Sequence, residues 1–381
     1  MKPISVLDIV VFGVINSFFI IGKIFWYRAI RSYEDRTGFD RRSGLLEYII
    51  VQFAKWSNNN LNTARVGSIF YSKNVSKLFF KYRRFRCGAA LLGDIVTEEI
   101  NDGPVKGVWF QSPQRGNEHD IILYYIHGGG FICASVYFYA EFLMTLVVAL
   151  QMQGFRNPAI FALEYEHVPN AEFSEQFSEV AAGWMYLVSK RPNSHLVISG
   201  DSNGATLALS LLLHMAKPSH SLPLVSPVLP AGAVFISPWL HSKYSRKKNQ
   251  NDYIGPKLLE KYFTLYSGKS KDCIEVYESP GLCKSRAWWA KAFPIAGIYL
   301  LYGRDELMAK EIEDFAMIIE QVGHVRLEGE IGQVHCWPIV ELFVGRTMDE
   351  RESGIEAITS TLAYMLLWKS SFTSNPNIRY P

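Results

Sequence analysis

A serine in the sequence Gly-Asp-Ser-Asn-Gly, at residues 200–204, is the first residue whose setting suggests chemistry. It follows an apolar run at residues 196–199 that favours a buried strand, and it precedes residues 205–213, which contain strong helix formers. The pattern Gly-x-Ser-x-Gly between a strand and a helix is typical of a nucleophile elbow, a tight turn that exposes the serine hydroxyl. We therefore predict that Ser202 is a nucleophile.

A serine nucleophile needs a base to take its proton and an acid to orient that base, in the chain order serine, acid, histidine. Asp305 follows an apolar run at residues 296–302 that reads as a strand. Its alternative role, shared with Glu306, is to cap the helix that follows. His335 follows a second strand, predicted at residues 325–329, at the sheet edge where functional residues gather. We predict Asp305 as the catalytic acid and His335 as the base.

Three glycines follow another apolar run, residues 121–126, in the sequence His-Gly-Gly-Gly at residues 127–130. Without side chains they allow close approach to a substrate carbonyl, and their amides can stabilise the negative charge that develops on its oxygen. A simple glycine turn between strand and helix is the alternative. The predicted oxyanion donors are the amides of Gly128, Gly129 and Asn203, and His127 and Gly130 complete the supporting motif.

The combined motifs resemble the hormone-sensitive-lipase branch of the α/β hydrolases over about residues 90–368. The resemblance also includes Glu164-Tyr165 with Pro169, Ser237-Pro238-Trp239, and Asp305-Glu306-Leu307 followed by His335. It implies the α/β-hydrolase fold, with a mostly parallel central sheet, helices on both faces and a helical cap. This chain departs from the branch at Asn203, where alanine is usual, and in the stretch at residues 165–169. Both departures concern specificity more than catalysis.

The N-terminal residues 1–27 contain a nearly continuous apolar run at residues 6–26. About 20 apolar residues are needed to cross the hydrocarbon core of a bilayer. Bulky aromatic residues end the run, where a cleaved signal peptide would have small ones. We therefore predict an N-terminal transmembrane helix that acts as an uncleaved, single-pass membrane anchor.

Two observations disagree about the side of the membrane on which the catalytic domain lies. Five arginines follow the apolar run closely, and the positive-inside rule then favours a cytosolic domain. The anchored members of the same branch, such as the arylacetamide-deacetylase-like enzymes and the fungal steryl acetyl hydrolases, imply the lumen of the endoplasmic reticulum instead. A sequon with Asn74 as the possible N-glycosylation site is compatible with the lumen, which we favour.

Residues 28–89 are predicted to form linker and cap helices, residues 241–290 a further cap insertion inside the catalytic domain at 90–368, and residues 369–381 a polar tail. Residues 77–86 interleave basic and aromatic side chains, which suits either membrane contact or a solvated face. The net charge of +3 indicates no general affinity for nucleic acid. The five cysteines lack metal-ligand spacing, although Cys273 and Cys283 could form a disulfide in an oxidising lumen.

These features together predict a membrane-anchored serine carboxylic-ester hydrolase that acts on a hydrophobic ester and needs no metal or cofactor. The order of anchor, His-Gly-Gly-Gly and Gly-Asp-Ser-Asn-Gly most resembles the fungal steryl acetyl hydrolases, which implies removal of acetyl groups from sterol esters. A broader lipid or xenobiotic esterase would share every catalytic residue. A non-catalytic receptor, as in the gibberellin receptors of plants, would lack the catalytic histidine, whereas His335 is present here.

Overall fold

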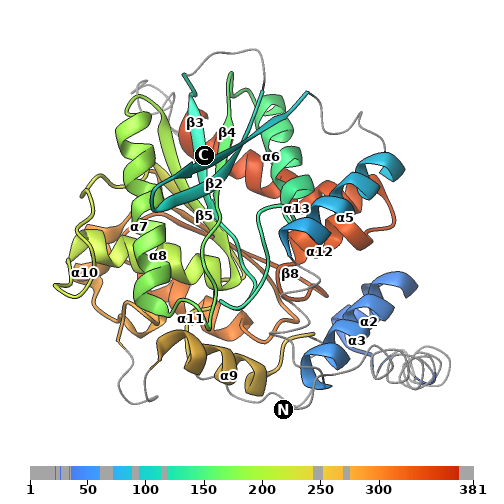
Figure 1. Ribbon diagram of the computed structural model, residues 1–381. Helices are drawn as coiled ribbons and strands as arrows, with labels where there is room; N and C mark the ends of the chain where they lie inside the picture. Colours follow the sequence, from blue (N-terminus) through green and yellow to red (C-terminus); the bar gives the residue numbers. More distant parts are fainter. Residues whose placement is uncertain are drawn as a thin grey trace, which may run out of the picture.

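A sheet of eight strands forms the centre of the computed structural model (Figure 1). The structure describes residues 22, 26, 34, 36–60, 72–87, 94–112, 118–242, 252–268 and 275–368. The strands lie in the order β1-β2-β4-β3-β5-β6-β7-β8, and all neighbours from β4 to β8 are parallel. Their bounds are β1 (Val96–Asp102), β2 (Val105–Gln111), β3 (Ile121–Ile126), β4 (Ala159–Leu163), β5 (His195–Asp201), β6 (Gly232–Ile236), β7 (Ile298–Gly303) and β8 (Val325–Glu330).

The central strands are buried on both faces, which explains their continuous apolar sequences. Every residue of β3, β4, β6 and β7 is buried, whereas the edge strands β1 and β8 keep exposed polar positions. The strands predicted at residues 121–126, 196–199, 296–302 and 325–329 correspond to β3, β5, β7 and β8. Because these strands run parallel, the carboxyl ends of β5, β7 and β8 meet at one edge of the sheet.

Helices cover both faces of the sheet (Figure 1). One hydrophobic core joins the sheet to α7 (Phe173–Lys190), α8 (Ser202–Ala216) and α11 (Ala309–Ile319). The other joins it to α6 (Ala140–Met152), α12 (Trp337–Val344) and α13 (Met348–Ala363), which is followed by η5 (Tyr364–Trp368). The predicted arrangement of a mostly parallel sheet between two helical layers is therefore confirmed.

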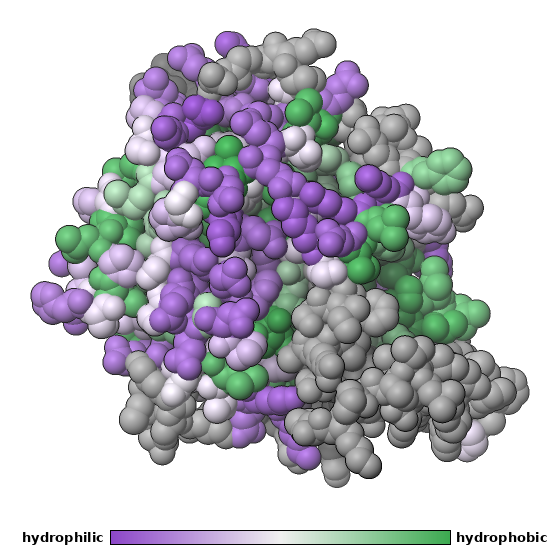
Figure 2. All heavy atoms as spheres, viewed as in Figure 1, coloured by the Kyte–Doolittle hydropathy of each residue, from purple (hydrophilic) through white to green (hydrophobic). Residues whose placement is uncertain are grey.

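Among the described residues, three helices precede the sheet in the region predicted to form linker and cap helices: α2 (Gly38–Arg42), α3 (Leu45–Asn60) and α5 (Lys73–Cys87). Hydrophobic side chains reach the surface where α3 and α5 lie (Figure 2). The second predicted cap region contains α9 (Pro256–Ser267), η4 (Pro280–Leu282) and α10 (Arg286–Ala292).

The predicted membrane anchor at residues 1–27 lies outside the described residues apart from two positions, as do Cys273 and the tail at residues 369–381. Within the described ranges, no helix combines the length and the apolar character required to cross a membrane.

Candidate active site

Ser202 lies at a tight turn between β5 and α8, where its φ of 51° places it in the left-handed region. The turn passes closely against β3, because a Cβ added to Gly200 would lie 2.6 Å from the Ile126 carbonyl oxygen, and one added to Gly204 would overlap the same oxygen. Only glycine fits at these two positions. The strained serine between them is the geometry of a nucleophile elbow.

Asp201, the residue before the nucleophile, is buried and accepts several hydrogen bonds. Its Oδ1 accepts from the Tyr125 hydroxyl at 2.7 Å and the Gly128 amide at 2.8 Å, and its Oδ2 accepts from the Tyr139 hydroxyl at 3.0 Å. The Cys336 thiol lies 3.6 Å from the same Oδ2. Burial raises the pKa of Asp201 in spite of these bonds. Asp201 thus ties together the elbow, the glycine loop and the loop that carries His335.

His335 and Glu306 approach each other inside the protein, at the sheet edge where β5, β7 and β8 end. His335 Nδ1 lies 3.8 Å from Glu306 Oε1, and the two side chains are 2% and 0% exposed. This separation is an ion-pair distance, and catalytic hydrogen bonds are often long before substrate binds. No hydrogen bond to His335 Nε2 is found in the described part of the chain, so this nitrogen can take a proton. The arrangement places Glu306 as the acid that orients His335.

Glu306 is held in place by Ser237, which follows β6, and by Gly303 at the end of β7. Its Oε2 accepts hydrogen bonds from the Ser237 hydroxyl at 2.6 Å and the Gly303 amide at 3.1 Å. Ser237 Oγ in turn accepts from the Cys336 amide at 2.9 Å. Because Cys336 follows His335 directly, this chain of bonds positions the acid and the base relative to each other.

The structure corrects the predicted position of the catalytic acid. The Asp305 carboxylate turns away from His335 and accepts a hydrogen bond of 2.6 Å from the Phe39 amide in α2. Sequence reasoning treated Glu306 only as a possible helix cap. Nothing in the sequence distinguishes the two adjacent carboxylates, because the turn after β7 decides which one faces the histidine.

Carboxylates around His335 set its protonation. Burial lowers its pKa, but the neighbouring Glu306 carboxylate, with the charges of Asp252 and Asp201, outweighs burial and raises the pKa above 6.5. Asp252 accepts a hydrogen bond of 2.9 Å from the Leu307 amide, and burial raises its own pKa to about 6. Sequence reasoning did not identify Asp252, which lies far from any recognised motif.

The predicted oxyanion donors need a second correction. The Gly128 amide is used by Asp201, so it cannot also bind an oxyanion. In the described part of the chain the Gly129 amide donates to no backbone acceptor. The Asn203 amide lies in the first turn of α8, where backbone N–H groups have no partner within the helix. Gly129 and Asn203 therefore remain as candidate donors.

The Asn203 side chain holds the glycine loop. Its Oδ1 accepts from the Gly130 amide at 2.7 Å, and its Nδ2 donates to the Tyr165 hydroxyl at 2.9 Å. That hydroxyl donates to the His127 carbonyl at 2.8 Å, closing a ring of bonds around the loop. His127 itself has a pKa lowered to about 3 by burial, which suits a neutral supporting residue.

Asn203→Ala is expected to lower the free energy of unfolding by about 1–3 kcal/mol, because the buried Gly130 amide and Tyr165 hydroxyl lose a partner. Urea denaturation followed by circular dichroism measures the change. Asn203→Asp keeps the acceptor for Gly130 but loses the donor to the Tyr165 hydroxyl and buries a second carboxylate near Asp201, so it should be no more stable than Asn203→Ala. An unchanged urea midpoint in Asn203→Ala would show that this ring of bonds contributes no stability.

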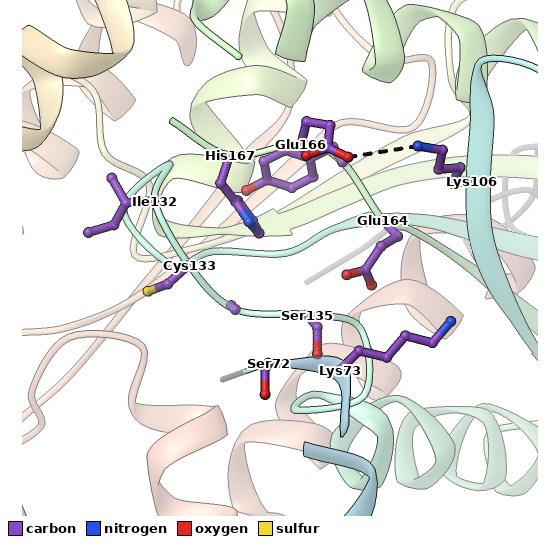
Figure 3. A pocket seen from close by; sticks show the side chains of 11 residues that line it. Ser72, Lys73, Lys106, Ile132, Cys133, Ser135, Glu164, Glu166 and His167 are labelled. Carbon is purple, nitrogen blue, oxygen red and sulfur yellow. Dashed lines mark ion pairs between the residues drawn. The ribbon is translucent and has the colours of Figure 1, made fainter. Parts of the chain in front are cut away.

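A hollow of about 240 Å³ lies beside the glycine loop and is not lined by Ser202, Glu306 or His335 (Figure 3). Glu164 faces it, and its Oε2 accepts a hydrogen bond of 2.9 Å from the Val136 amide. Burial raises the pKa of Glu164 to about 7. Lys106 and Glu166 form an ion pair of 3.8 Å at its rim. Glu164 thus fixes Val136, at the C-terminal end of the loop that begins with the glycines.

In the ranges that the structure describes, no group of three or more histidine, cysteine, aspartate or glutamate side chains is arranged to hold a metal ion. The chemistry available at this edge is that of a serine, a histidine and a carboxylate beside free backbone amides. Such a site, on a parallel sheet with a nucleophile elbow, defines an α/β hydrolase.

Comparison with known proteins agrees with this class. The profile of the alpha/beta hydrolase fold family matches residues 123–339, more than half of the chain, and the protein belongs to that family. Mouse neutral cholesterol ester hydrolase 1 is 30% identical over 147 residues, which cover 35% of each chain. An acetyl-hydrolase of Streptomyces hygroscopicus is 28% identical over 148 residues, or 39% of this chain and 43% of that protein. The matched segments therefore span less than half of these relatives.

Solved structures share the fold over most of their length. An esterase of the bacterial hormone-sensitive lipase family superposes with a TM-score of 0.63 at 18% identity, covering 85% of this chain and 99% of that one. Carboxyl esterase 2 of the fungus Tuber melanosporum superposes with a TM-score of 0.58 at 18% identity, covering 72% and 87%. These similarities establish the fold.

Proposed function

We propose that this protein is a membrane-anchored serine carboxylic-ester hydrolase that removes acetyl groups from steryl acetates. The observation that carries the hydrolase assignment is that His335 pairs with Glu306 while the next residue, Cys336, contacts Asp201 in the nucleophile elbow of Ser202. The apolar run at residues 6–26 supports anchoring. The similarity to a cholesterol ester hydrolase and to an acetyl-hydrolase supports a sterol ester and an acetyl group as the two halves of the substrate.

In the proposed reaction, His335 Nε2 takes the proton of the Ser202 hydroxyl while Ser202 Oγ attacks the carbonyl carbon of the ester. The amides of Gly129 and Asn203 stabilise the resulting oxyanion, each by roughly 3–4 kcal/mol in the transition state. The ester C–O bond then breaks, and His335 gives its proton to the oxygen of the departing alcohol. A water molecule activated by His335 attacks the acyl-enzyme in the same way and releases the acid.

A broader esterase would use the same residues and differ only in the pocket for the alcohol and acyl groups. A receptor without catalysis is disfavoured, because His335, Glu306 and their supporting hydrogen bonds are all in place.

The proposal predicts serine-dependent release of acetate from a steryl acetate by membranes that contain the full-length protein. The same membranes are assayed with a water-soluble aryl acetate, and Ser202→Ala membranes give the background for both substrates. Turnover of the aryl ester alone would retain the hydrolase and reject the sterol substrate. Turnover of neither ester above the Ser202→Ala background would reject catalysis.

The proposed location is the endoplasmic reticulum membrane, with the catalytic domain in the lumen. Protease protection of intact microsomes tests the side of the membrane: a lumenal domain is protected until detergent is added. Asn74 lies exposed on α5, where a glycan is sterically possible. A domain digested without detergent would place it on the cytosolic side.

A further inference from the structure

A stripe of exposed hydrophobic side chains runs along α5. Leu78 is 69% exposed and Phe85 86% exposed, although both are large and apolar. The stripe consists of Val75, Leu78, Phe79, Tyr82 and Phe85. Residues at this spacing lie on one side of a helix. Single exposed hydrophobic residues are ordinary, but a continuous stripe marks a surface that contacts something.

The opposite side of α5 is fastened to the body of the protein. Arg83 donates two hydrogen bonds of 2.8 Å to the Glu141 carboxylate, and its guanidinium lies over the ring of Phe343. Lys77 pairs with Glu99 at 2.7 Å. A bidentate arginine pair that is largely buried holds a helix in one rotation. Leu78, Tyr82 and Phe85 therefore face outward, whereas Phe79 at the edge of the stripe contacts Phe343, with 5.8 Å between the ring centroids.

Helix α3 presents a second stripe of the same kind, formed by Leu45, Leu46, Ile49, Ile50 and Phe53. Its other side packs inward through Tyr48 and Val51, which are buried against Phe39. Figure 2 shows hydrophobic side chains at the surface on the side of the molecule where α3 and α5 lie. Helices α3 and α5 thus lie on the same side of the protein (Figure 1).

We propose that the exposed apolar stripes of α3 and α5 together form a surface that docks on a lipid bilayer. The charge of α5 favours a bilayer over a protein partner, because its fifteen residues include six lysines and arginines and no acidic residue. Three of the six, Lys73, Lys77 and Arg83, pair with Glu99 and Glu141 of the body, and the other three add to the positive charge of the helix. Basic side chains beside aromatic ones suit the phosphate level of a membrane, with the apolar side chains below it. The inference rests on the anchoring part of the proposed function, because an anchor at residues 6–26 would bring α2 and α3 to the membrane surface.

Docking would bring the sheet edge that carries Ser202 and His335 near the bilayer. Asn58 of α3 donates a hydrogen bond of 2.9 Å to the Tyr253 carbonyl, and the Tyr253 hydroxyl donates one of 3.1 Å to the His335 carbonyl. The helix that carries one apolar stripe is therefore two hydrogen bonds away from the loop of the base. An apolar ester could then pass from the bilayer to the site with a short path through water.

Photocrosslinking of lipids to the full-length protein tests this surface without depending on hydrolysis. Ser202→Ala protein is reconstituted into phosphatidylcholine vesicles, with or without phosphatidylserine, that contain a photoreactive phospholipid, and the crosslinked peptides are mapped by mass spectrometry. We expect crosslinks on residues 45–53 and 75–85. In Leu78→Glu/Phe85→Glu we expect α5 labelling to fall by about tenfold or more, since two large side chains can no longer enter the bilayer.

The matched control is Leu224→Glu/Ile295→Glu, which changes two equally exposed apolar residues outside these helices. It should leave the labelling of α3 and α5 unchanged. Labelling spread evenly over the surface, or unaltered by Leu78→Glu/Phe85→Glu, would overturn the docking surface. A glycan on Asn74 would also overturn it, because Asn74 lies beside the stripe of α5 and a bulky polar group there would hold the helix off the bilayer. Crosslinking as expected without steryl acetate turnover would reject only the proposed substrate.

Discussion

Glu306→Gln is expected to lower kcat by about 10⁴-fold, which is the loss expected when the acid of a serine triad becomes a neutral amide. The glutamine keeps the size of the side chain and can still accept from Ser237. It cannot stabilise the positive charge that His335 acquires as it takes the serine proton. Steady-state kinetics on a soluble aryl acetate measures the loss, and circular dichroism verifies that the variant is folded.

Asp305→Asn is the matched control, since it removes the neighbouring charge at the end of the same strand. Its kcat should change by only a few-fold, because Asp305 contacts the Phe39 amide and not the base. If Asp305→Asn lowered kcat far more than Glu306→Gln did, Asp305 would be the catalytic acid.

The pH profile gives a second readout of the same pair. The base acts when neutral, so kcat/KM falls as the pH drops through the pKa of His335, which lies above 6.5. The proximity of the Glu306 carboxylate is the largest effect that raises this pKa. In Glu306→Gln the acidic limb of the residual activity should therefore move to lower pH, whereas in Asp305→Asn it should stay in place.

Gly129→Ala is expected to lower kcat by about 10²- to 10³-fold, the loss that follows removal of one oxyanion donor. Gly129 has a φ of 124°, and a Cβ there would overlap the carbonyl oxygen of Cys133. The loop must move to relieve this contact, and the Gly129 amide then no longer points to the developing charge.

Gly232→Ala is the control for the glycine change, because it lies in β6 and a Cβ there would make only an ordinary contact with Met365. Both variants are compared by kcat and by thermal unfolding. A Gly129→Ala protein with full kcat would show that the oxyanion is bound by other groups. A loss of kcat that matches a loss of folded protein would mean that the change acts on stability alone.

Much of the site could be predicted because its residues lie in local patterns. The elbow of Ser202 follows from two glycines between a strand and a helix, and the position of His335 follows from the end of β8. The glycine loop after β3 follows from residue type alone. Asp201 was visible in the same motif, but its role as the common acceptor for the elbow, glycine loop and base loop was not, because its partners Tyr125, Tyr139 and Gly128 lie elsewhere in the chain.

The sequence by itself determined the fold class and the glycine turn around Ser202, and it predicted Ser202 as the nucleophile and His335 as the base, because strand and turn patterns require only neighbouring residues. The tertiary structure decided which carboxylate faces the base and which amides remain free. Asp305 accepts a hydrogen bond from the Phe39 amide, 266 residues away. Glu306 instead accepts one from the hydroxyl of Ser237, which follows β6. The Gly128 amide donates its hydrogen bond to Asp201 and not to an oxyanion. Hydrogen bonds between distant segments select among chemically equivalent neighbours, and that selection exists only once the chain is folded.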